Sequence, residues 1–266
     1  MDIFLVVGIV MGALAVVVGM YVKGADIAVL LNPAAAIIIL VGTIAAVMNS
    51  FPKKEFLNIP KIIGALFREK KQENSVAIVE LIADMSQQAR KDGLLSLEAT
   101  MQSVENRFLK KGLTMVIDGI EHDYIREVLD SEIESMEARH RAAASIFSSA
   151  GSYAPTLGVL GAVIGLIGAL GNLNDTEKLG HMIAAAFVAT LYGIFIGYVL
   201  CHPISTRLKR KSYEEVNNMQ IIVEGVLSIQ AGENPKSIKM KLAGMLEPKD
   251  RLKVEEGDAA KQGKGE

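Results

Sequence analysis

Few side chains in this chain of 266 residues could carry enzymatic chemistry, and those few are scattered. Its four histidines, His122, His140, His181 and His202, do not have the spacing of metal ligands. The single cysteine, Cys201, has no partner within the chain for a disulfide. We find no glycine-rich phosphate loop, zinc-protease helix or nucleophile elbow in a supporting context. The sequence therefore predicts no enzyme, no metal site and no cofactor, and a net charge of -2 gives no reason to expect nucleic-acid binding.

Residues that could act on an ion lie in an uncharged stretch, GSYAPTLGVLGAVIG, at 151–165. Pro155 removes a backbone donor, which loosens the preceding helical turn. Thr156 in this stretch, and Thr190 in a later uncharged run, offer hydroxyl groups that can hydrogen-bond an ion's water or a carboxyl group. The residues alone leave two simpler interpretations open, a plain helix kink and threonines bonded to their own backbone.

The elements that must position these residues are membrane-spanning helices. Residues 3–22, 27–52, 142–174 and 179–206 contain no Asp, Glu, Lys or Arg. A helix needs about 20 apolar residues to cross the hydrocarbon core of a bilayer. We predict an all-α, polytopic membrane protein with four transmembrane helices and a cytoplasmic helical domain. The segment at 3–22 is not expected to be a signal peptide, because it has no basic start and a second span follows directly.

The absence of acidic residues from these spans constrains any role in ion transport. Proteins that carry ions across a bilayer usually place a carboxylate inside it. None of the four predicted spans has one, so any such carboxylate must come from a partner.

Small residues recur along the last two predicted spans at steps of three and four. A stripe of this kind lets helix backbones approach closely. We list as helix-packing residues Gly158, Gly161, Gly165, Gly193 and Gly197. Packing within the chain is the simpler interpretation of one such motif. Two adjacent stripes, together with Pro155 and the threonines, favour an interface that lines an ion path.

The distribution of basic residues predicts the orientation of the chain. The links between paired spans contain only Lys23 and Lys178, whereas basic residues cluster after the second and fourth spans: Lys53, Lys54, Lys61, Arg68, Lys70, Lys71, Arg207, Lys209, Arg210 and Lys211. Both termini are therefore expected in the cytoplasm. We divide the chain into a transmembrane hairpin (1–52), a cytoplasmic helical loop (53–141), a second hairpin (142–206), C-terminal cytoplasmic helices (207–246) and a disordered tail (247–266).

Within the loop, apolar periodicity predicts three helices. The first starts at Asn74 or Ser75 and stops at Gly93. The second runs from about Ser96 and ends near the Lys110-Lys111-Gly112 break. The third, from about 122 to 140, has no helix breaker and can continue into the third span. After the fourth span, a helix is predicted from 205 to about 231 and a short amphipathic one after GENPKSI.

Four motifs give the chain a resemblance to a known family. They are ARKDGLLSLE (89–98), APTLGVLGAVIG (154–165), YGIFIGYVLCHPISTRL (192–208) and EGVLSIQAGENP (224–235). With the layout of two hairpins and a long loop, they resemble the MotA family of flagellar stator subunits, relatives of TolQ and ExbB. The resemblance covers roughly residues 1 to 245.

The resemblance implies a mechanism that fits the missing carboxylate. Members of this family form a pentamer in the bacterial inner membrane around two copies of MotB, whose single span carries an essential aspartate. Ions pass between that span and the third and fourth spans of the family member, and the resulting motion drives the rotor protein FliG.

Individual residues acquire expected roles from the same resemblance. Pro155 matches the third-span proline beside the ion site, and Pro203 the proline at the cytoplasmic end of the fourth span. Thr156 and Thr190 match positions that face the aspartate. Arg90 and Glu98 match the loop charges that engage FliG; without the resemblance we would interpret them as solvated surface charges.

The transported ion is expected to be H⁺. Sodium-driven relatives tend to place extra hydroxyls along this wall, whereas this chain has Ala162 two turns after Pro155 and Ala189 before Thr190.

Three other functions stay open at this stage. A TolQ/ExbB-type energy-coupling subunit shares the ion-path residues but usually has three spans. A stand-alone channel or transporter would pass ions without a partner. A purely structural scaffold would tolerate Pro155→Ala.

Overall fold

The computed structural model describes residues 3–67 and 74–262. Regular structure in these residues is entirely helical. The chain divides into two compact units: a membrane unit (Met1–Lys70 and Arg139–Arg210) and a loop unit (Lys71–Ala138 and Lys211–Glu266). The basic residues Arg68, Lys70 and Lys71, which contributed to the predicted orientation, lie outside the described residues, as do the last four residues of the chain.

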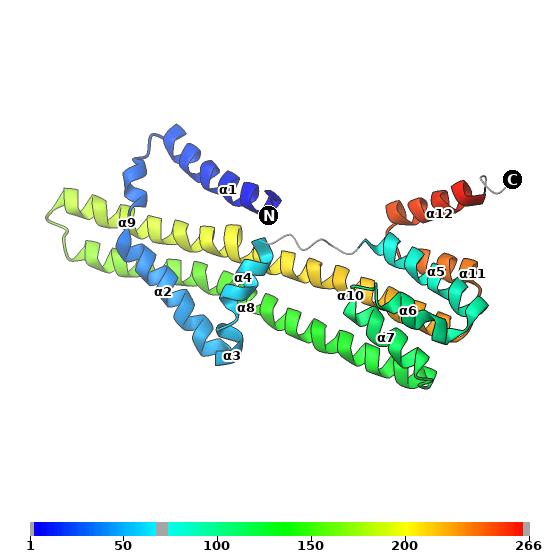
Figure 1. The fold of residues 1–266 in the computed structure, drawn as a ribbon. Coiled ribbons are helices and arrows are strands. Elements are labelled where there is room, and N and C mark those ends of the chain that lie inside the picture. Colours follow the sequence, from blue (N-terminus) through cyan, green and yellow to red (C-terminus); the bar gives the residue numbers. More distant parts are fainter. Residues whose placement is uncertain (1–2, 68–73, 263–266) are drawn as a thin grey trace. The chain divides into compact units, whose positions relative to one another are not determined.

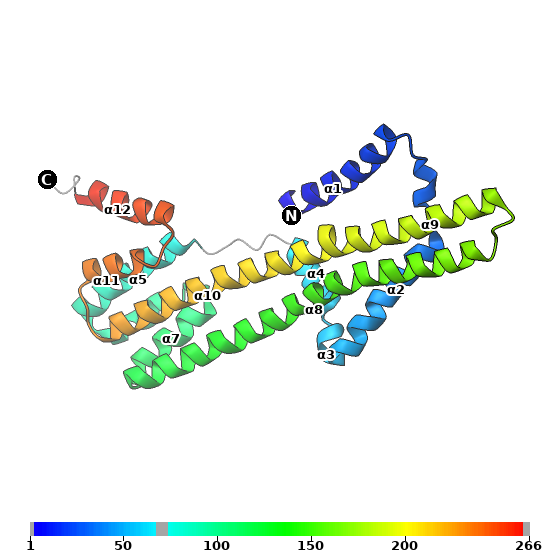
Figure 2. The same cartoon turned by 180° about the vertical axis from the view of Figure 1, so that it is seen from behind.

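Four helices are long and apolar enough to cross a membrane, which confirms the predicted number of spans. The first two are α1 (Ile3–Val22) and α2 (Pro33–Ser50), joined by the short 3₁₀ helix η1 (Ile27–Leu30). The third is the membrane part of α8 (His122–Leu170). The fourth begins as α9 (Thr176–Ile194) and passes through a π-helical segment, η3 (Phe195–Cys201), into α10 (His202–Gln230). Figures 1 and 2 show α9 lying alongside α8.

Pro203, expected at the cytoplasmic end of the fourth span, is the second residue of α10 and lies inside one helical run from Thr176 to Gln230. In η3 the His202 N–H donates to the carbonyl oxygen of Gly197, five residues earlier. A π turn is wider than an α turn, and the widened backbone accommodates a proline just after it.

Polar contacts attach α2 to α8 and α9 within the membrane unit. The Ser50 and Tyr153 hydroxyls lie 2.9 Å apart at the end of α2. At its other end the Asn32 side-chain amide donates to Ala185 O at 3.5 Å, and the Tyr192 hydroxyl donates to Leu30 O. Between these ends, a buried cluster joins the three helices through Ala35, Ile39, Ala154 and Ala189.

Two short helices follow α2 in the membrane unit. They are α3 (Lys53–Phe56) and α4 (Ile59–Phe67). Pro52 precedes α3, and it favours an extended residue before it, so α2 ends at Ser50.

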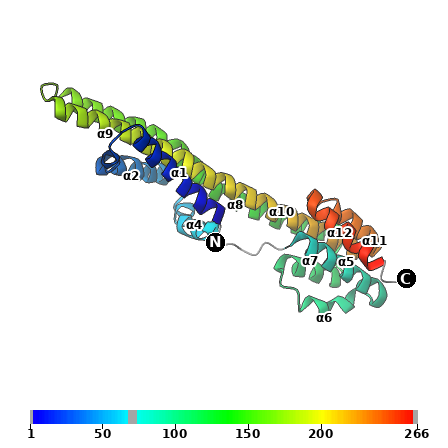
Figure 3. The same cartoon turned by 90° about the horizontal axis from the view of Figure 1, so that it is seen from above.

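The loop unit is built around one hydrophobic core. It contains α5 (Ser75–Asp92), the 3₁₀ turn η2 (Leu94–Ser96), α6 (Leu97–Met101), α7 (Arg107–Ile117), α11 (Pro235–Ala243), α12 (Pro248–Gln262) and parts of α8 and α10. Figure 3 shows α5 beside α11. Side chains with almost no exposure fill the core, among them Ile82, Leu97, Leu113, Leu129 and Ile221.

The predicted first and third loop helices are confirmed. α5 begins after Asn74, whose side chain accepts a hydrogen bond from Val76 N, and it ends at Gly93. α8 runs from His122 directly into the third span.

The predicted second loop helix is wrong. Two helices, α6 and α7, occupy the region, and Lys110-Lys111-Gly112 lies inside α7. Asn106 starts α7 by accepting from Leu109 N at 2.8 Å. A Cβ at position 112 would stand 3.0 Å from the side chain of Val226. Because the core already occupies that space, glycine fits inside the helix at this position.

The predicted disordered tail is also wrong for the residues that the structure describes. α12 covers Pro248–Gln262. Proline suits the first position of a helix, and the side chain of Val254, only 2% exposed, packs into the loop-unit core. Its surface ion pairs, such as Arg251–Glu255 at 2.9 Å, contribute little, whereas Val254 anchors the helix to the loop-unit core.

Candidate functional site

Within the membrane unit, α8 and α9 are in backbone contact along their glycines. A Cβ on Gly158 would lie 2.9 Å from Ala189 O and 3.2 Å from the Cα of Gly193. A Cβ on Gly193 would lie 2.6 Å from Ala154 O. Gly161 and Gly165 in turn face the methyl groups of Ala189 and Ala186, each at 2.9 Å from an added Cβ. The two small-residue stripes therefore face each other inside one chain.

The glycine stripes were expected to form an interface that lines an ion path. Within the chain their contacts are those of α8 with α9, the intramolecular packing that the sequence had left open as the simpler interpretation. The surfaces of these two helices that remain for a partner carry large apolar side chains: Val159, Leu160, Val163, Ile164, Ile167, Ile183, Phe187 and Ile194.

Pro155 lies against the π-helical segment of the fourth span. A Cβ on Gly197 would meet Pro155 Cγ at 2.8 Å and Gly151 O at 2.6 Å. Gly151 O is the carbonyl that loses its usual helical donor, because Pro155 has no N–H. The imidazole of His202 packs against the same residue, and its ring atoms would be 2.9 Å from a Cβ on Gly151. Two departures from regular α-helix thus meet at Gly151 and Gly197.

The predicted ion-path residues take different positions in the membrane unit. Pro155 and Ala162 are half-buried, and so is Thr190, whose Cα would be 3.3 Å from a Cβ on Gly158. Thr156 is exposed. The structure therefore places Thr190 beside the α8–α9 contact and leaves Thr156 accessible from outside the chain.

Both threonine hydroxyls donate to their own helix. Thr156 Oγ1 donates to Ser152 O at 3.2 Å, and Thr190 Oγ1 to Ala186 O at 3.5 Å. The neighbouring Ser152 donates to Ser148 O at 3.1 Å. A hydroxyl that donates in this way keeps oxygen lone pairs as acceptors. Thr156, on the exposed side, can therefore accept a hydrogen bond from a protonated carboxyl group outside the chain.

In the loop unit, Arg90 and Glu98 lie on either side of one turn. Arg90 is in the last turn of α5, Glu98 in the first turn of α6, and both are exposed. Neither forms an ion pair with another residue in the described part of the chain. Leu95, at 69% exposure, lies between them in the sequence.

A set of hydrogen bonds holds this turn, and sequence reasoning missed it. Gln88 Nε2 donates to Ser96 O at 2.8 Å, and Thr100 Oγ1 donates to Gln88 Oε1 at 2.8 Å. Ser96 Oγ donates to Gly93 O at 2.6 Å, and Gly93 adopts a φ of 83° that favours glycine. The sequence carried no clear signal for it, because the helical neighbours of Gln88 four residues before and after are the acidic residues Asp84 and Asp92.

Ionic contacts near the other end of the loop unit hold α8, α10 and α11 together. Glu224 accepts from Arg126 at 2.9 Å and lies 3.0 Å from Lys241 Nζ, which also lies 3.8 Å from Glu233. Partial burial alone would raise the pKa of Glu224, but the hydrogen bonds and charges of Lys241 and Arg126 outweigh it. The pKa of Glu224 therefore lies below its ordinary value.

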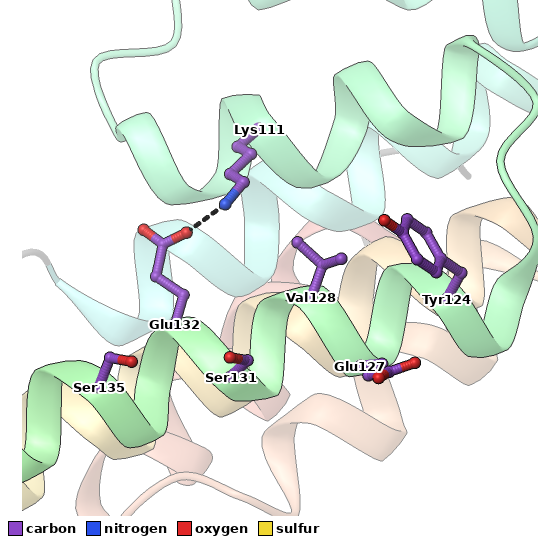
Figure 4. Close-up of a pocket in the computed structure, with 7 residues that line it drawn as sticks. All are labelled: Lys111, Tyr124, Glu127, Val128, Ser131, Glu132 and Ser135. Atoms are coloured by element: carbon purple, nitrogen blue, oxygen red, sulfur yellow. Dashed lines mark hydrogen bonds and ion pairs between the residues drawn. The ribbon is translucent and has the colours of Figure 1, made fainter.

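An open depression of about 440 Å³ lies between α7 and α8 of the loop unit (Figure 4). Its lining residues are Lys111, Tyr124, Glu127, Val128, Ser131, Glu132 and Ser135. Lys111 points toward Glu132 and forms an ion pair with it at 2.6 Å. Because Lys111 and Glu132 already neutralise each other, we assign no ligand to this depression. Among the described residues, no cluster of His, Cys, Asp and Glu could hold a metal ion.

Comparison with known proteins places these sites in context. The model of the MotA/TolQ/ExbB proton channel family matches residues 100–221, and the model named Motility protein A N-terminal matches residues 6–93. Motility protein A of Bacillus subtilis (strain 168) is 49% identical over 263 residues, which are 99% of this chain and 97% of that protein. Chemotaxis protein PomA of Vibrio alginolyticus is 32% identical over 96% of this chain and 100% of that protein.

A solved structure is similar over nearly the same length. The structure of the flagellar MotAB stator complex from Bacillus subtilis superimposes with a TM-score of 0.88 at 50% identity. The match covers 93% of this chain and 97% of that chain.

Proposed function

The chain belongs to the MotA/TolQ/ExbB proton channel family, and we propose that it is a stator subunit of a bacterial flagellar motor, coupling ion flow to torque on the rotor. It is a channel subunit and not an enzyme. The observation that carries this function is the near-full-length likeness to Motility protein A. That likeness includes the first hairpin, the feature expected to separate a stator subunit from a TolQ/ExbB-type subunit.

A MotB-type partner supplies the carboxylate that the spans lack. The similar Bacillus subtilis structure is a complex with such a partner. In this chain, the predicted spans at 3–22, 27–52, 142–174 and 179–206 contain no Asp or Glu. The partner helix would lie on the exposed side of α8, where Thr156 and Ser152 offer the polar atoms. The α8–α9 face is unavailable to it because glycine contacts within the chain already fill it.

In this arrangement Thr156 distinguishes the two protonation states of the partner's aspartate. Its hydroxyl hydrogen is committed to Ser152 O, so its oxygen accepts from the protonated acid. An ionised carboxylate has no hydrogen to donate and would require the Thr156 hydroxyl to leave Ser152 O. Proton release therefore weakens the contact between the partner helix and α8, which is the local change that a rotary step requires.

Pro155 and the π-helical segment would let the inner ends of the two spans respond. Gly151 O lacks its helical donor, and the adjacent Gly197 lies in a wide turn. A turn with fewer α-type hydrogen bonds bends at lower cost than a regular one. Pro203 follows that turn after His202 and, having no N–H, cannot form an α-type hydrogen bond to the carbonyl oxygen of Val199.

The α5–α6 turn is the proposed contact with the rotor protein FliG. Arg90 and Glu98 are exposed there without a partner among the described residues, and Gln88 fixes the turn that carries them. Exposed charges make weak, salt-screened contacts, which suits a surface that engages and releases on every step.

Assembly and orientation complete the proposal. The four apolar helices and the family fit a bacterial inner-membrane protein. We propose that both termini lie in the cytoplasm, from the basic residues after α2 and the fourth span, and that five copies surround two partner helices. The transported ion is H⁺, because Ala162 and Ala189 leave few oxygens for Na⁺.

Reconstitution tests the shared ion path. Proteoliposomes containing the chain together with its MotB-type partner are expected to take up protons, and those with the chain alone are not. Proton flux from the chain alone would show that the carboxylate is not supplied by a partner. The motor function has a separate test in the parent bacterium: normal swimming after deletion of the gene would refute the stator assignment.

A further inference from the structure

The segment that follows α2 is not among the residues to which the ion path and the rotor contact were assigned above. It comprises α3, the link residues Leu57 and Asn58, and α4. α2 has 18 residues, about 27 Å of helix at 1.5 Å per residue, and ends at Ser50. Ser50 contacts the hydroxyl of Tyr153, a residue type enriched at membrane surfaces. The segment therefore begins at the surface of the bilayer.

This segment combines exposed apolar and basic side chains. Leu57 is 60% exposed and Ile63 is 37% exposed. Lys53, Lys54 and Lys61 are exposed as well. None of the three lysines forms an ion pair with another residue in the described part of the chain, and Glu55 is the only acidic residue between Ser50 and Phe67.

α4 also has the pattern of a helix that lies in an interface. Ile59, Ile62, Ile63 and Leu66 recur at helical spacing along one side, and Lys61 lies off that stripe. Among the side chains that the structure describes in α4, Leu66 is the one that is fully buried. Ile59 and Ile62 are half-buried and Ile63 is exposed, so part of the apolar stripe of this short helix is not covered by the described residues of its unit.

We propose that α3 and α4 form a docking surface for anionic phospholipids of the leaflet at which α2 ends. Leu57 and Ile63 enter the boundary between headgroups and acyl chains, while the three lysines bind lipid phosphates. Continuity with a membrane span fixes this surface next to the leaflet, and its charge is complementary to anionic lipid. The links at the opposite ends of the spans have no comparable cluster, with only Lys23 and Lys178. The proposal rests on membrane residence and not on the stator role.

Tryptophan fluorescence can test this surface, because the chain contains no tryptophan. A Leu57→Trp variant of the full chain is placed in vesicles that contain phosphatidylglycerol and phosphatidylcholine. Bromine is carried by one lipid or the other at the same mole fraction. Brominated phosphatidylglycerol is expected to quench Leu57→Trp more strongly than brominated phosphatidylcholine. Leu95→Trp in the loop unit, where Leu95 is 69% exposed against 60% for Leu57, is the matched control and is expected to show no quenching by either.

Replacing Lys53, Lys54 and Lys61 together by glutamine separates recognition of anionic lipid from apolar insertion. Each lysine near an anionic surface changes partition by about fivefold, so the preference for phosphatidylglycerol should largely disappear while quenching itself persists. Glutamine at Lys91, Lys236 and Lys249, which are exposed in the loop unit, should leave the preference intact.

Two results would overturn the proposal. Absence of quenching at Leu57→Trp, repeated with Ile63→Trp in a folded protein, would place the segment away from the bilayer. Equal quenching by both lipids, unchanged by the lysine substitutions, would show apolar insertion without lipid recognition. Soluble glycerol phosphate at constant ionic strength should not alter the preference; if it did, the site would bind free phosphate and not the leaflet. None of these outcomes depends on motility or ion flux.

Discussion

Replacement of Gly193 by alanine tests the direct backbone contact between α8 and α9. The added Cβ would lie 2.6 Å from Ala154 O, 3.0 Å from the Cα of Gly158 and 3.1 Å from the Cα of Pro155. All three are backbone atoms, so no flexible side chain can move aside. Since ordinary contact begins at 3.4 Å, the two helices must separate by 3.4 − 2.6, or about 0.8 Å, at this level.

Two opposing terms set the size of the effect. Alanine in place of glycine stabilises a helix by about 1 kcal/mol. Overpacking a well-packed contact costs about 1–3 kcal/mol, and the rigid backbone on both sides places this site near the upper value. The net loss is then about 2 kcal/mol, which corresponds to a decrease in melting temperature of about 4–8 °C for a chain of this size.

The single cysteine provides the assay. Cys201 is half-buried in the π-helical segment next to this contact, so a fluorogenic thiol reagent reports when that part of the fourth span opens. The control is Gly8→Ala in α1, where no atom lies within 4 Å of the added Cβ. Gly8→Ala should leave the melting temperature unchanged or raise it. A Gly193→Ala protein that melts like the Gly8→Ala control would refute the backbone contact.

Three further predictions concern the loop unit. Arg90→Glu combined with Glu98→Lys should abolish swimming but leave the melting temperature within about 1 °C, because neither side chain has a partner in the described structure; full motility in a soft-agar assay would exclude the rotor contact. Gly93→Ala should destabilise the protein by about 1–2 kcal/mol because of its φ of 83°, measurable in thermal melts, whereas Gly64→Ala, which has open space and no positive φ, should not. The lowered pKa of Glu224 means that its stabilising contribution is present above the ordinary value of 4.5 and is lost as pH falls through the lower folded pKa. Melts of Glu224→Gln and the parent chain should therefore differ at neutral pH and converge in acid, and a constant difference would contradict the role of the ion pairs.

Local patterns in the sequence were sufficient to predict the helices that are determined by their own residues. The four spans follow from hydrophobicity over about 20 residues, and α5 follows from a capping residue, a periodic stripe and a terminal glycine. The roles of Arg90, Glu98, Pro155 and Thr156 came from motif resemblance, and the contacts described here are compatible with them without testing them.

Other features could not be predicted because they depend on segments distant in the chain. Gly112 looked like a helix end, but Val226 on α10 occupies the space beside it and α7 continues. The tail looked too polar to fold, yet burial of the single side chain of Val254 accompanies a helix there. Gln88 looked like an ordinary surface amide until the turn at Ser96 was placed beside it.

The uncharged stretch at 151–165 shows most clearly what the sequence determined and what only the tertiary structure decided. Its residue types alone determined that it spans the membrane, that Pro155 interrupts a hydrogen-bond pattern and that no acidic group is present. Only the tertiary structure decided which helix its glycines contact, because a small-residue stripe permits close approach without specifying the partner. The contacts of Gly158 and Gly193 assign that partner to α9 of the same chain and leave Thr156 on the outward side.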